Sequence, residues 1–175
     1  MLRGEAMATQ LAGKYLTFKL AEEEYGLQIL KVKEIIGLTR ITRVPRTPDF
    51  IRGVINLRGR VIPLLDVRSR FGLADAAYTD RTVVVVIELG DATTGLVVDA
   101  VSDVTDIPPE QIEPRTGARA GRAPMVRGLG KRADRVSFIL DVPALLALDG
   151  ATPATAVATP SLPPSIPSST PAVAR

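Results

Sequence analysis

Apolar and polar residues alternate with a period of two along much of the chain, which is typical of β-strands. Residues 14–20 alternate between apolar and more polar side chains, so we expect a strand buried on one face. After a polar turn, residues 25–27 start a returning strand and complete a β-hairpin. A nearly continuous run of valine and isoleucine at 82–89 predicts a strand buried on both faces, and residues 94–99 return from it.

The most informative segment is 50–72, which reads FIRGVINLRGRVIPLLDVRSRFG. Two apolar runs flank Arg58-Gly59, and because glycine accepts a positive φ, this pattern predicts a hairpin turn. Pro63 has no N–H for a strand ladder, so we expect a free edge or a bulge there. Asp66 follows the second run and is expected to cap a short helix.

Three segments do not fit this alternation. Residues 1–13 are expected to form a loose leader. The apolar positions of 30–36 allow a strand or a helix, and we favour a helical turn that ends at Gly37. Residues 150–175 are almost entirely Ala, Pro, Ser and Thr, and cannot bury enough apolar surface to offset roughly 1–2 kcal/mol of backbone entropy per residue. We therefore expect a folded domain at 14–149 and a disordered tail.

The two halves of the chain resemble each other weakly. The matching segments are Ile51–Val54 with Val126–Leu129 and Val61–Val67 with Val136–Val142, both 75 positions apart, and more loosely 25–27 with 94–96, 69 positions apart. Each half is expected to form one small sheet, and a small sheet protects its edges best by closing. The sequence thus predicts a mostly β fold of two small five-stranded β-barrels with short helices, and a groove where the barrels meet. Such grooves are preferred binding positions.

The amino-acid composition excludes several classes of function. The 175 residues include no Cys and no His, which excludes a disulfide framework, a thiol nucleophile and a phosphorylated imidazole. Asp66 and Asp141 each follow an apolar strand, as the phosphorylated aspartate of a receiver domain does, but no strand–helix alternation accompanies them. Helix capping is therefore the favoured interpretation. We expect no enzyme activity, no metal and no cofactor.

Neither a signal peptide nor an apolar run approaching the roughly 20 residues of a membrane span is evident. We therefore expect a cytoplasmic protein without direct membrane insertion.

A basic segment between residues 115 and 135 leaves a second class of function open. Its cations are Arg115, Arg119, Arg122, Arg127, Lys131, Arg132 and Arg135. A small β-barrel protein could use such a segment to bind nucleic acid or anionic lipid head groups. No aromatic residue lies within it to stack on bases, so a solvated loop is the default interpretation and no nucleic-acid partner is expected.

The sequence resembles the CheW family of bacterial chemotaxis coupling proteins. The similarity covers roughly residues 14–149 and is carried by EEYGLQILKVKEIIG (23–37), TPDFIRGVINLRGRVIPLLDVRSRFG (47–72), GLVVDAVSDV (95–104) and RGLGKRADRVSFILDVPALL (127–146). The resemblance implies two SH3-like β-barrels. It also implies a non-enzymatic adaptor that bridges methyl-accepting chemotaxis receptors and the histidine kinase CheA in membrane-associated arrays.

The resemblance also implies a set of partner-binding positions: Val32, Glu34, Ile35, Gly53, Arg58, Gly95, Val98 and Val104. Receptors are expected in the groove between the barrels, and the regulatory domain of CheA against the first barrel. Other interpretations stay open from the residues themselves. Val32, Ile35 and Val98 also suit a core, the two glycines suit backbone geometry, and Arg58 also suits a solvated turn or an ion pair within the protein.

Overall fold

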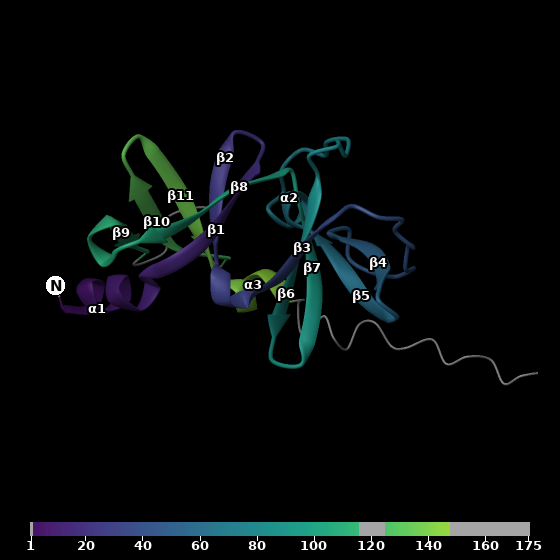
Figure 1. Cartoon of the computed structure of the whole chain (residues 1–175), viewed down its shortest axis with the longest axis horizontal. Coiled ribbons are helices and arrows are strands. Elements are labelled where there is room, and N and C mark those ends of the chain that lie inside the picture. The colour runs from purple at the N-terminus through teal and green to yellow at the C-terminus, as the bar shows by residue number, and fades with distance from the viewer. Residues whose placement is uncertain (1, 116–124, 148–175) are drawn as a thin grey trace, which may run out of the picture.

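The computed structural model describes residues 2–115 and 125–147, and strands dominate it (Figure 1). The elements are α1 (Leu2–Leu11), β1 (Gly13–Leu20), β2 (Glu23–Gln28), η1 (Ile29–Lys31), β3 (Val32–Gly37), β4 (Ile51–Leu57), β5 (Arg60–Asp66), α2 (Val67–Arg70), β6 (Val83–Leu89), β7 (Ala92–Val98), β8 (Ala100–Ile107), η2 (Pro109–Gln111), β9 (Ile112–Pro114), β10 (Val126–Arg132), β11 (Arg135–Leu140) and α3 (Val142–Leu146). The predicted tail lies outside the described residues.

The strands form two sheets, which confirms a mostly β fold of two packed, SH3-like units. A 5-stranded sheet has the order β3-β6-β7-β5-β4 and uses one uninterrupted stretch of chain, so we name it the continuous barrel. A 6-stranded sheet has the order β8-β1-β2-β11-β10-β9 and combines the start of the chain with its later part, so we name it the split barrel. The prediction of five strands in each barrel was wrong for the split barrel, which has the short strand β9 as a sixth.

The structure confirms the internal repeat, but the first hairpin, β1–β2, belongs to the barrel formed by the second half of the chain. In the continuous barrel, β7 pairs in parallel with β5, and Gly95 lies opposite Leu64. In the split barrel, β2 pairs in parallel with β11, and Gly26 lies opposite Ile139. The partners in these two pairs differ by the offsets of the sequence repeat. The prediction that each half forms its own barrel was therefore wrong, since the first hairpin completes the second half.

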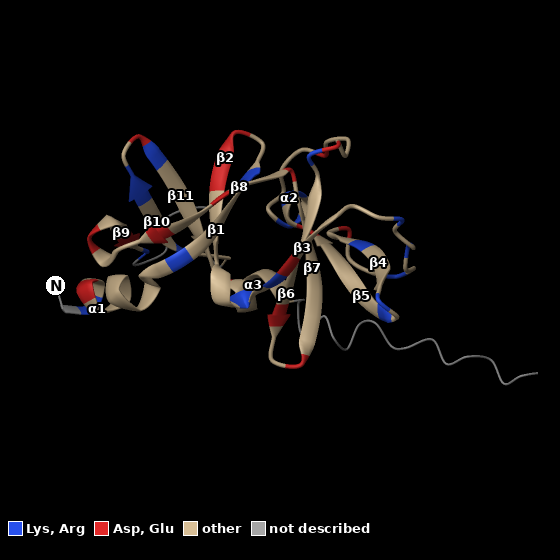
Figure 2. Cartoon of the chain, in the orientation of Figure 1, with Lys and Arg blue, Asp and Glu red and all other residues tan. Residues whose placement is uncertain are grey.

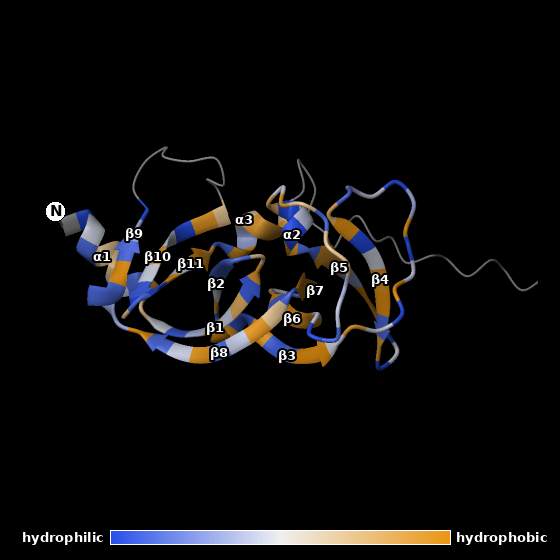
Figure 3. Ribbon diagram, turned by 90° about the horizontal axis from the view of Figure 1, so that it is seen from above, coloured by the Kyte–Doolittle hydropathy of each residue, from blue (hydrophilic) through white to orange (hydrophobic). Residues whose placement is uncertain are grey.

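The apolar side chains divide into three clusters that follow this architecture. One cluster fills each barrel, and the largest lies between the barrels, with contributions from both sheets. Strands next to the seam are consequently buried on both faces. This includes β1, where Tyr15 and Thr17 are buried along with the alternate residues, so the prediction of a half-buried strand was wrong. The expected strand with two buried faces at 82–89 is confirmed by β6. Figure 3 shows the apolar segments of both barrels meeting near α2 and α3.

Two arginines of α2 join the barrels at their surface. Arg70 donates from Nε to the carbonyl oxygen of Leu145 (3.1 Å) and from Nη2 to that of Ala147 (2.7 Å), at the end of α3. Arg68 pairs with Asp99, at 3.3 Å, in the short connection from β7 to β8. The seam is thus filled by apolar side chains and bridged by charged ones.

Two local predictions were wrong because tertiary contacts decide the structure. The expected loose leader is the helix α1, which buries Ala8 and Leu11 in the core of the split barrel and accepts a hydrogen bond from the Tyr15 hydroxyl at the Leu11 carbonyl. The favoured helical turn at 30–36 is the one-turn helix η1 followed by strand β3. β3 is extended because β6 offers it a complete ladder partner.

Pro63 lies in an interior strand rather than at a full edge. It faces Val54 of β4, whose N–H and C=O both bond to Thr42 on the other side (2.8 and 2.9 Å). Pairing with β7 begins only at Leu64, so the strand edge is free only locally at the proline. The bulge that accompanies it lies in β4, between Ile51 and Gly53.

Candidate partner-binding site

The hairpin tip between β4 and β5 displays Arg58. Arg58 and Gly59 have φ values of 52° and 82°, and the Asn56 side-chain oxygen accepts a hydrogen bond from the Gly59 N–H at 2.8 Å. Two consecutive positive φ values are typical of the tight hairpin turn that fits the twist of a two-stranded ladder. The predicted hairpin and its turn are thereby confirmed, and the geometry directs the arginine to the surface.

Glu34 of β3 holds the Arg58 guanidinium by two hydrogen bonds. Nη1 donates to Oε1 at 2.9 Å and Nη2 to Oε2 at 2.8 Å. The Arg58 side chain is 74% exposed and that of Glu34 is 20% exposed. An exposed ion pair adds only about 0–1 kcal/mol to stability. Its main physical consequence is therefore a fixed orientation of the arginine. Ile35, the next residue of β3, is an aliphatic residue that is 44% exposed and points to the other face of this outer strand.

Both predicted glycines serve the backbone. Gly53 has a φ of 141°, and a Cβ atom there would lie 2.2 Å from the Thr42 carbonyl oxygen. A Cβ at Gly95 would lie 2.5 Å from Cδ2 of Leu64 and 2.7 Å from Cγ1 of Val84. Substituting either residue therefore disturbs the continuous barrel itself, which supports the structural interpretation of these positions.

The three predicted valines lie in different environments. Val98 is 1% exposed and belongs to the core between the barrels. Val32 is partly buried and packs against the same core. Val104 is 50% exposed, on β8 of the split barrel. The structure therefore brings Glu34, Ile35 and Arg58 together on one barrel, whereas Val104 lies on the other.

Ile35 and Val104 nevertheless occupy corresponding positions in the repeat. Each lies on an outer strand and is separated by one strand from a repeat-related leucine, Leu96 or Leu27. Figure 3 places their strands, β3 and β8, along the same side of the molecule. Each barrel thus exposes an aliphatic residue on its outer strand along this side, Ile35 on β3 and Val104 on β8. We use the name adaptor face for the group on the continuous barrel alone, which consists of Glu34, Ile35 and Arg58.

A second polar constellation surrounds Arg52 on β4. Its Nε donates to Oδ2 of Asp66 at 2.9 Å, and its Nη2 contacts Asp75. The Tyr78 hydroxyl donates to the same Asp66 oxygen at 3.2 Å, and Asp66 also accepts from the Ser69 N–H as the cap of α2. Burial lowers the pKa of Arg52, but the hydrogen bonds to the two carboxylates outweigh this and raise it above the usual value. Burial and the charge of Asp66 raise the pKa of Tyr78 above 10.0.

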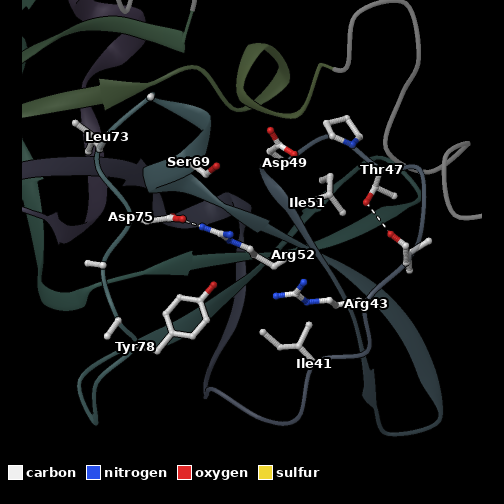
Figure 4. Close-up of a pocket in the computed structure, with 15 residues that line it drawn as sticks. Ile41, Arg43, Thr47, Asp49, Ile51, Arg52, Ser69, Leu73, Asp75 and Tyr78 are labelled. Carbon is white, nitrogen blue, oxygen red and sulfur yellow. Dashed lines mark hydrogen bonds and ion pairs between the residues drawn. The ribbon is translucent and has the colours of Figure 1, made fainter.

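This constellation forms one side of an open pocket, shown in Figure 4. The other walls come from the segment between β3 and β4 and from the connector after α2. The sequence patterns did not predict the pocket or the roles of Arg52, Asp75 and Tyr78 in it. The segment between β3 and β4 and the connector after α2, which form its walls, carry no periodic pattern of apolar residues. They are brought together only by the strand pairing around β4.

Four basic residues on strands β10 and β11 contact polar or acidic side chains of the split barrel. The contacts are Arg127 with Asp141 (3.9 Å), Lys131 with Glu113, Arg135 with Glu24 (3.9 Å), and Arg132 with the Thr105 hydroxyl. Figure 2 shows the blue hairpin of β10 and β11 beside the acidic residues of β2 and β9. The three contacts to carboxylates lower the net positive field that a nucleic acid would require. Residues Arg119 and Arg122 lie outside the described residues.

The two aspartates expected to cap helices do so. Asp66 accepts from the Ser69 N–H, and Asp141 accepts from the Ala144 N–H at 3.0 Å. Among residues 2–115 and 125–147, no group of acidic side chains is arranged to hold a metal ion. The helices in this described part are too short or too polar to cross a bilayer.

Comparison with known proteins gives a consistent result. Residues 14–149 match the family model described as the CheW-like domain. Chemotaxis protein CheW from Klebsiella aerogenes is 41% identical over 152 residues, which cover 83% of this chain and 92% of that protein. Chemotaxis protein CheW from Helicobacter pylori is 33% identical over 136 residues, covering 78% and 82%. The crystal structure of the scaffolding protein TtCheW from Thermoanaerobacter tengcongensis superposes with a TM-score of 0.76 at 35% identity, covering 81% of this chain and 97% of that one.

The matched family model spans both barrels, and the solved scaffolding protein reproduces their arrangement over nearly its whole length. The chain therefore belongs to the CheW-like domain family.

Proposed function

We propose that this protein is a chemotaxis signalling adaptor that couples methyl-accepting receptors to the histidine kinase CheA. The observation that carries the proposal is the match along residues 14–149 to proteins named chemotaxis protein CheW, together with the scaffolding protein of the same fold. The adaptor acts by binding partners and carries no chemistry of its own. It works in the cytoplasm and reaches membrane-bound receptor arrays through those partners.

The adaptor face is the part of the surface best suited to bind the CheA regulatory domain. It combines an exposed aliphatic residue, Ile35, with an arginine whose orientation is fixed by Glu34. A hydrophobic centre with a charged rim is typical of protein interfaces. Because Arg58 is oriented before binding, less side-chain entropy is lost when a partner carboxylate binds it. Val104 on the split barrel is proposed as a contact for a second partner, the receptor.

Kinase assays in receptor-containing membranes test the proposal. Autophosphorylation of the cognate CheA is measured with and without this protein, and with and without receptor. We expect the protein to raise kinase activity only when receptor is present. An Arg58→Ala variant should lose most of this effect while keeping the far-UV circular dichroism of the wild type. Failure of the wild-type protein to raise kinase activity and to co-sediment with either partner would contradict the adaptor proposal.

A matched control is available on the other barrel. Arg135 is also an exposed arginine near a hairpin turn and has a carboxylate partner, Glu24, at 3.9 Å. An Arg135→Ala variant should support kinase activity close to that of wild type, since it lies away from the adaptor face. Equal losses in the two variants would show that the effect of Arg58 is not specific to its position.

A further inference from the structure

We propose that the pocket beside Arg52 is a docking site for an acidic, partly apolar linear segment of a partner protein, and that Arg43 binds a carboxylate of that segment. The pocket shares no residue with the adaptor face. The inference therefore stands apart from the coupling function, and the two can fail independently.

The shape of the pocket favours an extended chain over a small molecule. Its volume is about 1160 Å³ and it is widely open to solvent. Small-molecule sites usually enclose most of the ligand surface, whereas an open trough leaves one side of a peptide in water. Apolar residues on its walls provide places for aliphatic side chains: Ile41, Val44, Pro48, Ile51, Leu73, Ala76 and Ala77.

The charges of the pocket favour an anion at one point. Arg52 is neutralised by the carboxylates of Asp66 and Asp75. Figure 4 shows the Arg43 side chain reaching from the opposite wall towards the space between Arg52 and Tyr78. Within the part of the chain that the structure describes, no hydrogen bond or ion pair is formed by Arg43. A guanidinium group without a carboxylate partner, beside an apolar surface, is suited to bind a carboxylate with two parallel hydrogen bonds.

The segment that contains Arg43 is basic along its length. Between β3 and β4 it carries Arg40, Arg43 and Arg46 and one acidic residue, Asp49. A basic wall beside apolar side chains is complementary to a segment in which carboxylates flank aliphatic residues. Asp49 lies at the far end of the pocket from Tyr78 (Figure 4). It therefore disfavours a ligand carboxylate at that end and gives the site a direction.

Hydrogen bonds hold both walls in place. The Thr42 bridge to Val54 anchors the basic segment to β4, and the Thr47 hydroxyl donates to the Val44 carbonyl at 3.0 Å. On the other wall, the Tyr78 hydroxyl bonds to Asp66 while 42% of the residue stays exposed. A pocket that is already formed loses less entropy when a flexible segment binds.

The test is a selection of random peptides displayed on phage against the full-length protein, followed by anisotropy measurements with the selected peptides in labelled form. We expect enrichment of peptides in which Asp or Glu lies next to aliphatic residues. Arg43→Gln should weaken their binding about tenfold, the effect of losing one charge-assisted contact. Arg43→Lys should retain part of the affinity, and Asp49→Asn should increase it by roughly twofold, because a like charge is removed.

The exposed Arg60 in β5 lies outside the pocket and provides the control, so Arg60→Gln should bind the peptides as wild type does. Because Arg43 is exposed, its variants should keep the wild-type circular dichroism. The proposal is overturned by any of three results: no enrichment above the empty support, enrichment of peptides without acidic residues, or acidic peptides that bind Arg43→Gln as tightly as wild type.

Discussion

The continuous barrel and the split barrel each hold an arginine–aspartate pair at the start of their helix, 75 positions apart. Arg52 lies 2.9 Å from Asp66, whose side chain is 5% exposed. Arg127 lies 3.9 Å from Asp141, whose side chain is 29% exposed. The continuous barrel adds a second carboxylate and a tyrosine to its pair, whereas the pair in the split barrel is looser. Both barrels therefore cap a helix with this aspartate. Among residues 2–115 and 125–147, only the aspartate of the continuous barrel is part of a larger polar network.

The hairpin tips differ in the same way. Arg58 and Ala133 occupy repeat-related positions and both have a positive φ, 52° and 45°. Only the first carries a charged side chain, which Glu34 orients. The corresponding acidic residue of the split barrel, Asp103, bonds instead to a backbone N–H in its own strand. The two hairpin turns thus share a backbone conformation, but only the turn of the continuous barrel presents a charged side chain, that of Arg58.

The largest expected effect comes from two repeat-related glycines. A Cβ at Gly53 would lie 2.2 Å from a backbone oxygen, with φ at 141°, whereas a Cβ at Gly128 would lie 2.8 Å from the Glu113 oxygen without a positive φ. Gly53→Ala should lower the free energy of unfolding by about 3 kcal/mol, because steric overlap and backbone strain add. Gly128→Ala should cost roughly half as much. Urea unfolding followed by circular dichroism measures both, and equal costs would contradict the account.

A smaller difference is expected for the two capping pairs. Arg52→Gln should cost about 2 kcal/mol, because it leaves the buried carboxylate of Asp66 without its cation. Arg127→Gln should cost less than about 0.5 kcal/mol, since its pair is long and exposed. The same unfolding experiment gives both values. A cost for Arg127→Gln that matches Arg52→Gln would show that the distance and burial of the pairs do not decide their contribution.

The smallest effect is a dependence on alkaline pH. Burial raises the pKa of Tyr15 in the split barrel and of Tyr78 in the continuous barrel above 10.0. The unfolded chain then releases these protons at a lower pH than the folded chain does. The stabilising contribution is complete below about pH 10 and is lost as pH rises towards the folded-state pKa.

Unfolding free energies between about pH 9 and 11 test this dependence. The Tyr15→Phe and Tyr78→Phe variants should each show a shallower loss of stability with rising pH than wild type. A slope that neither substitution changes would show that these tyrosines keep their protons equally well in both states.

Local patterns in the sequence predicted much of the fold. The Arg58-Gly59 turn, the caps at Asp66 and Asp141 and the valine-rich strand all depend on neighbouring residues, and all three are confirmed. The repeat also predicted two small packed barrels, which the structure confirms. These features were predictable because turn geometry and helix capping are decided within a few residues.

Features decided by distant contacts were missed. β3 is a strand because β6 pairs with it, and α1 is ordered because its Leu11 packs in the core of the split barrel. The exchange of hairpins between the halves could not be predicted from local sequence, because the β1–β2 hairpin could form equivalent strand pairs with either half. The adaptor face was partly predicted, since Arg58 and Glu34 were both named, but their pairing across the sheet and the burial of Val98 required the structure.

The most direct test of the account is the affinity of this protein for the isolated regulatory domain of its cognate CheA, measured by titration calorimetry. The central claim is that the oriented Arg58 makes the continuous barrel the kinase-binding side. We predict that Arg58→Ala weakens binding at least about tenfold, as expected for a charge-assisted contact, while Arg135→Ala changes it less than about twofold. Equal affinities for wild type and Arg58→Ala, or an equal loss in Arg135→Ala, would contradict the claim.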